Sequence, residues 1–505
     1  MKQKINRILI ANRGEIAIRI ARTCKEMGIE TVGLYSEIEQ TLPHVREMDF
    51  SICLGSGPLS ETYLNISKII QIAKANGVDA IHPGYGFLSE NAKFCKEVKK
   101  SGIIFIGPPP EVIELMGDKA MSKMKMGEIG VPLIPGVLIE DLKDKSIFDL
   151  ANKIGYPVLI KASAGGGGKG MRIVNKASEL LPSIEGAKRE ALASFGDDRV
   201  LLEKYIVNPR HIEFQVMSDQ HANHLHFFER DCSIQRRYQK IVEETPSPFL
   251  SPELRQQMGQ TALKICRGIG YVGAGTIEFI VDENGHFFFL EMNTRLQVEH
   301  PITEMTTGLD LVALQVKVAE GEKLPMQQSE IKKQGHAIEV RIYSEDAEND
   351  FLPCTGKILY RGTPRSPGVR LDTGYQDGTE VTVHFDPMLA KLIAFAPERP
   401  QAIKKLQQAL KETPFIGVTT NRDYLIKILQ SQAFLSGDVT TKFIEQHHDE
   451  MIKKLQDERE SQEKMAAALA IVVATQNPLA KKTTPDDFAQ FPSTWDELSG
   501  FRNGE

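Results

Sequence analysis

The stretch PVLIKASAGGGGKGMRIV, residues 157–174, places a glycine-rich loop with one lysine between two short apolar runs. Glycine lacks Cβ, so the backbone N–H groups of such a loop close over an anionic ligand. A dinucleotide-binding G-x-G-x-x-G turn needs a helix directly after the glycines, whereas the residues that follow here are typical of a strand. A P-loop needs Ser or Thr after Lys169, where Gly170 stands. The stretch predicts a strand–loop–strand hairpin over a triphosphate, with a flexible surface hairpin as the alternative.

The N-terminal segment has the pattern of a β-α-β unit. Residues 8–11 form an apolar run that predicts a buried strand, and residues 14–27 carry apolar side chains spaced to share one face of a helix. A second strand is predicted over residues 30–36. This order indicates an α/β fold that begins with a doubly wound parallel sheet, closed by the proline-rich turn at 107–110.

The composition is ordinary for a globular protein of about three domains: 505 residues, 41% hydrophobic and 25% charged. A net charge of −6 and the lack of a long basic run argue against a nucleic-acid or membrane surface. Six scattered cysteines without a C-x-x-C pair favour a reducing compartment over a disulfide scaffold or a zinc site. The first residues do not resemble a signal peptide, so a cytoplasmic protein is expected.

A hairpin is predicted around residues 284–285, where two β-rich runs flank Asn-Gly. With this dipeptide at the centre of a two-residue turn, Glu283 faces His286. Counting back along both strands, Glu278 faces Glu291. Directly opposed residues point to the same side of a sheet, so two carboxylates are expected to lie face to face.

This carboxylate pair predicts a metal site. Two facing carboxylates repel each other, so a cation is expected between Glu278 and Glu291, and Asn293 shares their side of the sheet. Hard oxygen ligands suit Mg²⁺ that carries nucleotide phosphates. The alternative is a solvated hairpin face, or a register slipped by one residue.

The strand that holds Glu291 is predicted to continue to residue 299. Four polar residues then alternate onto one face: Asn293, Arg295, Gln297 and Glu299. Arg295 is suited to hold a small planar anion bidentately, and Glu299 is a candidate general base. An exposed edge strand is the alternative interpretation.

Five stretches, in this order and spacing, resemble the biotin carboxylase family of ATP-grasp enzymes: ILIANRGEIA (8–17), HPGYGFLSEN (82–91), the glycine-rich loop, RDCSIQRRYQK (230–240) and EMNTRLQVEH (291–300). The resemblance covers about residues 4–446. It implies an ATP-grasp core between two smaller domains, in a protein that is usually a homodimer. The expected parts are an N-terminal doubly wound domain (1–116), the ATP-grasp domain (117–333) with a mobile lid at about 134–206, a C-terminal mixed α/β domain (334–446) and a helical, partly disordered extension (447–505).

The resemblance implies ATP-dependent carboxylation of biotin by bicarbonate through carboxyphosphate, giving N1-carboxybiotin, ADP and phosphate. Carried over by motif, the residues that bind ATP are Lys119, Lys161, Gly165, Gly166, Gly167, Gly168, Glu203, Lys204, His211 and Gln235. The residues that hold Mg²⁺ or Mn²⁺ are Glu278, Glu291 and Asn293. The residues expected to be catalytic are Lys240, Arg295, Glu299 and Arg341. Arg295 holds bicarbonate, Glu299 is its base, Lys240 contacts bicarbonate and the γ-phosphate, and Arg341 stabilises the biotin enolate. One departure is Tyr238, which stands where many relatives have His.

The tripeptide Met124-Lys125-Met126 matches the core of the biotin-attachment motif. It lies, however, within a helix predicted over 118–129, where Met121 and Met124 are spaced as core-facing residues. The biotin is therefore expected on a separate carrier protein, with a carboxyltransferase subunit as a further partner. The resulting reading is the biotin carboxylase component of an acyl-CoA carboxylase, of acetyl- or propionyl-CoA type.

Three alternatives stay open at this point. One is the ATP-binding subunit of a two-subunit pyruvate carboxylase, another is a different ATP-grasp ligase, and the third is a non-catalytic nucleotide-binding scaffold. The segment after residue 447 carries an Ala-rich apolar run, 464–473, and the only tryptophan, Trp495. Tryptophan is common at interface anchors, so this segment is predicted to dock a partner subunit.

Overall fold

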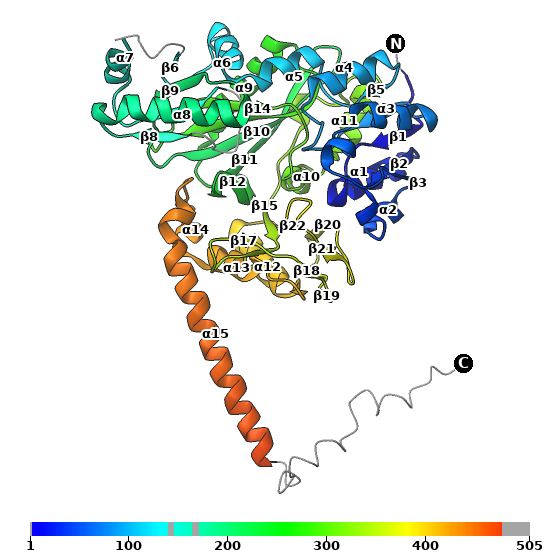
Figure 1. Cartoon of the computed structure of the whole chain (residues 1–505), viewed down its shortest axis with the longest axis vertical. Coiled ribbons are helices and arrows are strands. Elements are labelled where there is room, and N and C mark those ends of the chain that lie inside the picture. The colour runs from blue at the N-terminus through cyan, green and yellow to red at the C-terminus, as the bar shows by residue number, and fades with distance from the viewer. Residues whose placement is uncertain (1–2, 140–145, 164–170, 477–505) are drawn as a thin grey trace. The chain divides into compact units, whose positions relative to one another are not determined.

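The computed structural model of the chain describes residues 3–139, 146–163 and 171–476. The chain divides into two compact units, residues 1–448 and 449–505. The first unit opens with a five-stranded parallel sheet in the order β3-β2-β1-β4-β5, as the β-α-β pattern predicts (blue and light blue in Figure 1). The strands are β1 (Arg7–Ile10), β2 (Glu30–Tyr35), β3 (Phe50–Cys53), β4 (Ala80–His82) and β5 (Ile104–Phe105). The helices are α1 (Gly14–Glu26), α2 (Pro43–Glu47), α3 (Ile66–Ala75) and α4 (Ala92–Lys100).

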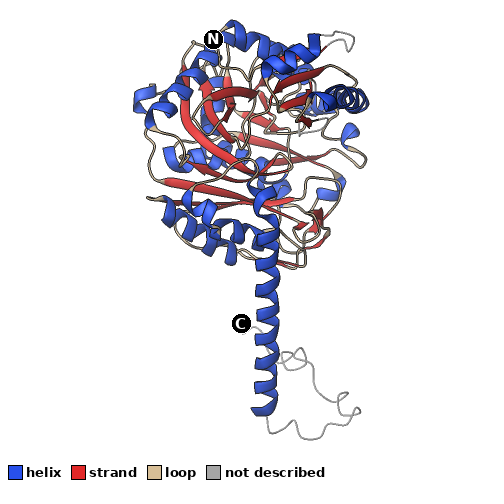
Figure 2. Cartoon of the chain, turned by 90° about the vertical axis from the view of Figure 1, so that its left-hand side faces the viewer, coloured by secondary structure: helices blue, strands red, loops and turns tan. Residues whose placement is uncertain are grey.

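An antiparallel sheet of eight strands lies at the centre of the first unit, in the order β14-β13-β10-β11-β12-β15-β22-β20. Its long strands curve, as Figure 2 shows in red. The strands are β10 (Arg210–Ser218), β11 (His224–Arg236), β12 (Gln239–Thr245), β13 (Gly273–Val281), β14 (Phe287–Asn293), β15 (His336–Tyr343), β20 (Val369–Thr373) and β22 (Met388–Ala396). The helices that pack on this sheet include α9 (Pro252–Ile269), α10 (His300–Thr307), α11 (Leu311–Ala319) and α12 (Arg399–Lys411).

A smaller sheet of four strands has its own apolar core. Its order is β6 (Gly136–Ile139), β9 (Val200–Lys204), β7 (Val158–Ala162) and β8 (Arg172–Val174), with helices α7 (Ser146–Ile154) and α8 (Leu180–Phe195). The two strands predicted on either side of the glycine-rich loop are confirmed, because β7 and β8 pair antiparallel. The glycines themselves, Gly165 to Gly168, lie outside the described residues.

Helix α6 (Lys119–Glu128) follows α5 (Pro110–Gly117) and confirms the helix predicted around the Met-Lys-Met tripeptide. It begins where the side chain of Asp118 accepts the N–H groups of Ala120 and Met121. The predicted inward face is wrong: Met121 and Met124 are 53% and 69% exposed, and Met126 is buried instead. The cause is that Ala120 and Met126, rather than these two methionines, lie on the side of the helix that packs on the protein.

The C-terminal part of the first unit adds short elements around β20 and β22. The strands are β16 (Glu345–Asp346), β17 (Leu352–Pro353), β18 (Gly356–Lys357), β19 (Tyr360–Arg361), β21 (Glu380–Val381) and β23 (Phe415–Ile416). The helices are α13 (Arg422–Gln430) and α14 (Gln432–Ser436).

Buried ion pairs connect α1 to segments far along the chain. Nη2 of Arg19 lies 2.6 Å from Oε1 of Glu304, and Nζ of Lys391 lies 3.2 Å from Oε2 of Glu15. Lys391 is fully buried and also donates to the carbonyl of Val298 at 2.8 Å. Because such pairs satisfy charges that are out of water, the early and late parts of the unit depend on each other.

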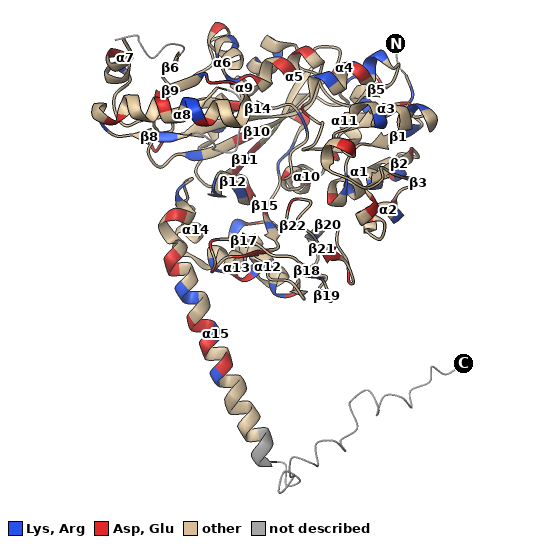
Figure 3. Ribbon diagram, viewed as in Figure 1, with Lys and Arg blue, Asp and Glu red and all other residues tan. Residues whose placement is uncertain are grey.

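Helix α15 (Phe443–Gln476) runs from the end of the first unit into the second. Figure 3 shows that Lys, Arg, Asp and Glu give way to uncharged residues toward its C-terminal end. There Met465, Leu469, Ile471 and Val472 are between 46% and 71% exposed. Trp495 lies outside the described residues. Among the helices that the structure describes, none has the length and apolar character needed to cross a bilayer.

Candidate active site

The hairpin of β13 and β14 brings two carboxylates together, since Glu278 pairs with Glu291 as predicted. The predicted two-residue turn is wrong. The N–H of Asp282 donates to the carbonyl of His286 at 2.9 Å, which leaves a three-residue loop whose last residue, Gly285, has a φ of +83°. Such a loop shifts the pairing by one residue, and a β-bulge directly after Glu278 shifts it back. The loop and the bulge shift the register in opposite directions. The predicted pairing therefore holds, and both carboxylates lie on the same side of the sheet.

The strand β14 ends at Asn293, so its predicted continuation to residue 299 is wrong. The backbone leaves the sheet where the N–H of Thr294 donates to Oε1 of Glu90 at 2.9 Å, instead of to a strand partner. The side chains converge nevertheless. Arg295 donates to Oδ1 of Asn293 and to Oε1 of Gln297, at 2.8 Å each, and to Oε2 of Glu90 at 2.7 Å.

Lys240 on β12 lies at the centre of the polar cluster. Its Nζ donates to Oε1 of Glu278 and Oε1 of Glu299 at 2.8 Å each, and it also contacts Glu213. Burial alone would lower the pKa of Lys240, but Glu213, Glu278 and Glu299 outweigh burial and raise it well above its usual value. Lys240 therefore carries a permanent positive charge between the carboxylate pair of the hairpin and Glu299.

Glu299 lies directly before α10 and is fully buried between two cations. Lys240 donates to its Oε1, and Nη2 of Arg341 on β15 donates to its Oε2 at 2.9 Å. Burial raises the pKa of Glu299, but Lys240 and Arg341 together lower it well below its usual value. Arg341 is held in turn by Oε1 of Glu243, which accepts from Nε at 2.7 Å and lies 2.6 Å from Nη2. Glu299 is thus a buried carboxylate that its two cationic neighbours hold in the ionised form, the form that can accept a proton.

His211 on β10 and Gln235 on β11 complete the surroundings of Glu278. Nε2 of His211 lies 2.8 Å from Oε2 of Glu278, and its Nδ1 lies 2.6 Å from Nε2 of Gln235. Burial lowers the pKa of His211, yet the adjacent Glu278 reverses the effect and raises it. The amide of Asn293 donates to Oε1 of Glu278 at 2.8 Å.

Three lysines, Lys119, Lys123 and Lys161, lie near the buried carboxylate of Glu203 on β9. Nζ of Lys161 on β7 lies 2.8 Å from Oε2, and Lys123 of α6 contacts Oε1. Burial and the charge of Lys119 lower the pKa of Lys161 to about 8. Burial and the charge of Lys161 lower the pKa of Lys123 to about 6. Three lysines thus meet a single carboxylate, and a bound phosphate group would favour their charged ammonium forms.

The side chain of Lys204 has backbone partners, and the side chain of Tyr238 is exposed. The ammonium group of Lys204 donates to the carbonyls of Gly155 and Tyr156, at 2.8 and 3.2 Å. Tyr238 lies in the turn between β11 and β12, where it and Arg237 have φ values of +66° and +49° and where its side chain is 58% exposed.

The donor set of the hairpin fits a hard divalent cation. Glu278, Glu291 and Asn293 offer oxygen atoms, and no thiolate is among them, which suits Mg²⁺ or Mn²⁺. Burial and then the neighbouring Glu278 raise the pKa of Glu291. A divalent cation between the two carboxylates would favour the ionised form of both.

Four residues that structure this site were not predicted from the sequence: Glu90, Lys123, Glu213 and Glu243. Two had a signal. Lys123 follows Lys119 by four residues and so shares its helix face, and Glu213 follows His211 by two and so shares its strand face. Glu90 and Glu243 reach the site only through the tertiary fold, which no local pattern reveals.

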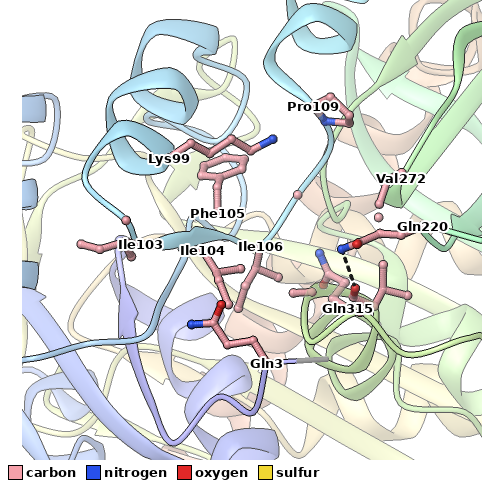
Figure 4. A pocket seen from close by; sticks show the side chains of 16 residues that line it. Gln3, Lys99, Ile103, Ile104, Phe105, Ile106, Pro109, Gln220, Val272 and Gln315 are labelled. Atoms are coloured by element: carbon pink, nitrogen blue, oxygen red, sulfur yellow. Dashed lines mark hydrogen bonds between the residues drawn. The ribbon is translucent and has the colours of Figure 1, made fainter. Parts of the chain in front are cut away.

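A separate cavity of about 440 Å³ lies between β5, β13 and α11 (Figure 4). Phe105 and Ile106 line one side of it and Val272 the other, and Nε2 of Gln220 donates to the carbonyl of Val318 at 3.3 Å. None of the described residues of the candidate active site lines this cavity, so the two are distinct.

Three protein-family profiles match the chain in succession. They describe the biotin carboxylase N-terminal domain (residues 4–113), the carbamoyl-phosphate synthase L chain ATP-binding domain (118–327) and the biotin carboxylase C-terminal domain (339–446). The mitochondrial methylcrotonoyl-CoA carboxylase subunit alpha of Dictyostelium discoideum is 49% identical over 500 residues, which is 99% of this chain and 70% of that protein. The chain spans 61–70% of the length of the subunits of this name that it matches. The biotin carboxylase of Allochromatium vinosum is 49% identical over 447 residues, which is 88% of this chain and 99% of that protein.

Two solved structures of biotin carboxylases are also similar to this chain. The biotin carboxylase domain dimer of Hydrogenobacter thermophilus 2-oxoglutarate carboxylase, in complex with MgADP, ADP and bicarbonate, has a TM-score of 0.85 and 47% identity. It covers 89% of this chain and 99% of that one. The Campylobacter jejuni biotin carboxylase in complex with a β,γ-ATP ligand also has a TM-score of 0.85, with 45% identity over 88% of this chain and 99% of that one.

Proposed function

The chain belongs to the biotin carboxylase family, and from that premise we propose that it uses ATP to carboxylate biotin with bicarbonate, giving N1-carboxybiotin, ADP and phosphate. The observation that carries the proposal is Glu299, an ionised carboxylate buried between Lys240 and Arg341 and one lysine away from the carboxylate pair. Bicarbonate is a poor nucleophile until its proton is removed, and this arrangement supplies a base together with cations that offset the charge of the product.

We assign a separate role to each of the four proposed catalytic residues. Arg295 holds bicarbonate, and Glu299 takes the proton from its hydroxyl. Lys240, fixed by its carboxylate partners, contacts both bicarbonate and the γ-phosphate. Arg341 stabilises the enolate of biotin by its guanidinium charge. Arg295, Lys240 and Arg341 each place a positive group where negative charge develops, and such electrostatic stabilisation is the largest single source of catalysis in many enzymes.

Substrate and metal binding use the remaining residues. We assign ATP to Lys119, Lys161, Glu203, Lys204, His211, Gln235 and the glycines at 165–168. Glu278, Glu291 and Asn293 would hold Mg²⁺ or Mn²⁺, which supplies charge neutralisation at the transferring phosphoryl group. The excess of lysines around Glu203 supports the phosphate assignment.

We infer that the biotin is attached to a separate carrier protein and that a carboxyltransferase subunit is the next partner, within an acyl-CoA carboxylase. The match to the Dictyostelium subunit supports this choice, because it continues past residue 446 through the segment that the shorter biotin carboxylase relatives do not cover. A homodimer is proposed from the dimer of the Hydrogenobacter domain.

The test is ATP hydrolysis by the purified chain with MgCl₂, with and without bicarbonate and free biotin. Hydrolysis that requires bicarbonate and rises with biotin supports the proposal. Hydrolysis that ignores bicarbonate would indicate another ATP-grasp reaction, and the absence of turnover despite tight ADP binding would indicate a non-catalytic scaffold.

A further inference from the structure

Glu339 on β15 is a buried carboxyl group to which the catalytic cycle above gives no role. Its side chain is fully buried, and neither of its oxygen atoms has a hydrogen-bond partner among the residues that the structure describes. Leaving an ionised carboxylate in that state costs several kcal/mol, so a partner or a proton is required.

The register of the sheet identifies the nearest candidate partner. Glu339 pairs directly with Glu243 of β12 in the antiparallel ladder, so both side chains are on the same face of the sheet. Oε1 of Glu243 accepts a hydrogen bond from Nε of Arg341 and lies 2.6 Å from its Nη2, whereas Oε2 of Glu243 is buried and has no partner among the described residues. Two carboxyl groups, with three unpartnered oxygens between them, thus lie side by side behind the guanidinium that holds Glu299.

We propose that Glu339 is kept in its protonated form at neutral pH and donates that hydrogen to Oε2 of Glu243, which makes it a positioning residue for Arg341. The inference rests on the proposed function, because the position of Arg341 affects turnover only if Arg341 and Glu299 act in catalysis. A neutral Glu339 supplies the one donor that the pair lacks. A second negative charge there would repel Glu243 and pull Arg341 away from Glu299.

The charged groups around Glu339 agree with this protonation state. The charged side chains that act on it, from β12, β15, β22 and the residue before α10, are Glu243, Arg341, Lys391 and Glu299. Lys391 is already engaged by Glu15 and the carbonyl of Val298. Burial, reinforced by Glu243 and opposed by Lys391, raises the pKa of Glu339 well above its usual value.

Glu243 responds to the same surroundings. Burial raises its pKa to about 7, against the opposing charge of Arg341. A proton is therefore held by the pair at neutral pH, and the contact of Oε1 of Glu243 with the guanidinium of Arg341 assigns that proton to Glu339. His300 stays neutral, since burial and then Lys391 lower its pKa well below its usual value.

The kinetic test compares Glu339→Gln with Glu339→Leu in the full chain. The glutamine amide keeps a neutral donor in place, so kcat within about twofold of the wild type is expected. Leucine leaves Oε2 of Glu243 buried and unpaired, and kcat should fall about tenfold or more, with the KM for ATP unchanged. Equal losses in the two variants would show that the negative charge of Glu339 is needed and would overturn the proposal, as would full activity of the leucine variant.

Infrared spectroscopy in D₂O tests the proton without relying on catalysis. The difference spectrum of the wild type minus Glu339→Gln at pH 7 should contain the carbonyl stretch of a buried carboxylic acid, and the difference spectrum with the exposed control Glu398→Gln should not. If the first difference spectrum lacks this band, Glu339 does not hold the proton and the proposal fails. This readout separates the two hypotheses, because a failure of biotin carboxylation would leave the band in place.

Discussion

At the residue scale, Glu299 owes its charge to two cations rather than to water. Replacing it by Gln keeps the shape and the contacts possible from Lys240 and Arg341 but removes the group that accepts a proton. Turnover with bicarbonate and biotin should fall by about 10²–10⁴-fold, the usual contribution of a general base. The affinity for MgADP, measured by calorimetry, should stay near that of the wild type. Near-normal biotin-dependent turnover in Glu299→Gln would contradict the assignment.

The lowered pKa of Lys161 predicts that nucleotide binding depends on pH. Its pKa in the free protein is lowered to about 8, and bound phosphate favours the charged ammonium. Below this pKa the ammonium group of Lys161 is already charged. Above it, binding must take up a proton, so the affinity for MgADP should fall by up to about tenfold for each pH unit.

Calorimetry at pH 8.5 to 9 in two buffers of different ionisation enthalpy measures that proton uptake directly. The matched variant Lys161→Arg keeps its charge at every pH in this range, and its affinity should therefore depend less on pH. Binding of MgADP to the wild type without proton uptake would be inconsistent with the lowered pKa.

At the element scale, the hairpin of β13 and β14 shows how far sequence reasoning reaches. The pairing of Glu278 with Glu291 could be predicted, because Asn-Gly identifies a turn and strands alternate with a period of two. The three-residue loop and the compensating bulge could not be predicted. The same local sequence pattern fits a two-residue turn and also a three-residue loop combined with a bulge. The end of β14 at Asn293 was also missed, because the partner of Thr294 is Glu90, some two hundred residues earlier in the chain.

Helix α6 makes a prediction about Lys125. Biotin attachment needs the lysine at the tip of a hairpin, whereas Lys125 lies on a helix and donates to Glu128 at 3.2 Å. Protein produced in cells that biotinylate other substrates should carry no biotin on the peptide that contains Lys125, as judged by mass spectrometry. A biotinylated carrier domain expressed in the same cells is the positive control, and a stoichiometric mass increment on Lys125 would refute the prediction of a separate carrier.

At the scale of the whole molecule, the eight-stranded sheet joins segments that are distant in sequence. Strand β12 pairs with β15, about one hundred residues later, and this pairing brings Arg341 to Glu299. The first parallel sheet followed from a local β-α-β pattern, but no local signal selects the partner of β12. The sequence could therefore provide a list of candidate catalytic residues through family resemblance, and only the fold provides their contacts.

Lys391 is expected to matter for the stability of the first unit. Lys391→Met leaves the buried carboxylate of Glu15 without its ammonium partner. Breaking a buried pair in this way typically costs about 3–5 kcal/mol of unfolding free energy. Urea unfolding followed by circular dichroism measures the change, and the exposed control Lys357→Met should stay within about 0.5 kcal/mol of the wild type. A loss under about 1 kcal/mol for Lys391→Met would show that Glu15 is satisfied without it.

The second unit, residues 449–505, is predicted to serve assembly rather than chemistry, because every residue assigned to the active site precedes it. A chain truncated after residue 448 should keep its turnover with free biotin. It should no longer co-purify with the carrier or carboxyltransferase subunits. Unchanged co-purification would rule out docking by this segment.

The buried pairs of α1 also bear on how the protein is made. Arg19 leaves the ribosome 285 residues before Glu304, the carboxylate that neutralises it in the finished structure. At roughly 5–20 residues per second, that interval is on the order of 15–60 s. During this time the nascent N-terminal domain keeps Arg19 and Glu15 in water, and the face that will meet the later strands stays uncovered. The face of α1 that these pairs bury is thus completed only when the strand that carries Lys391 has been synthesised.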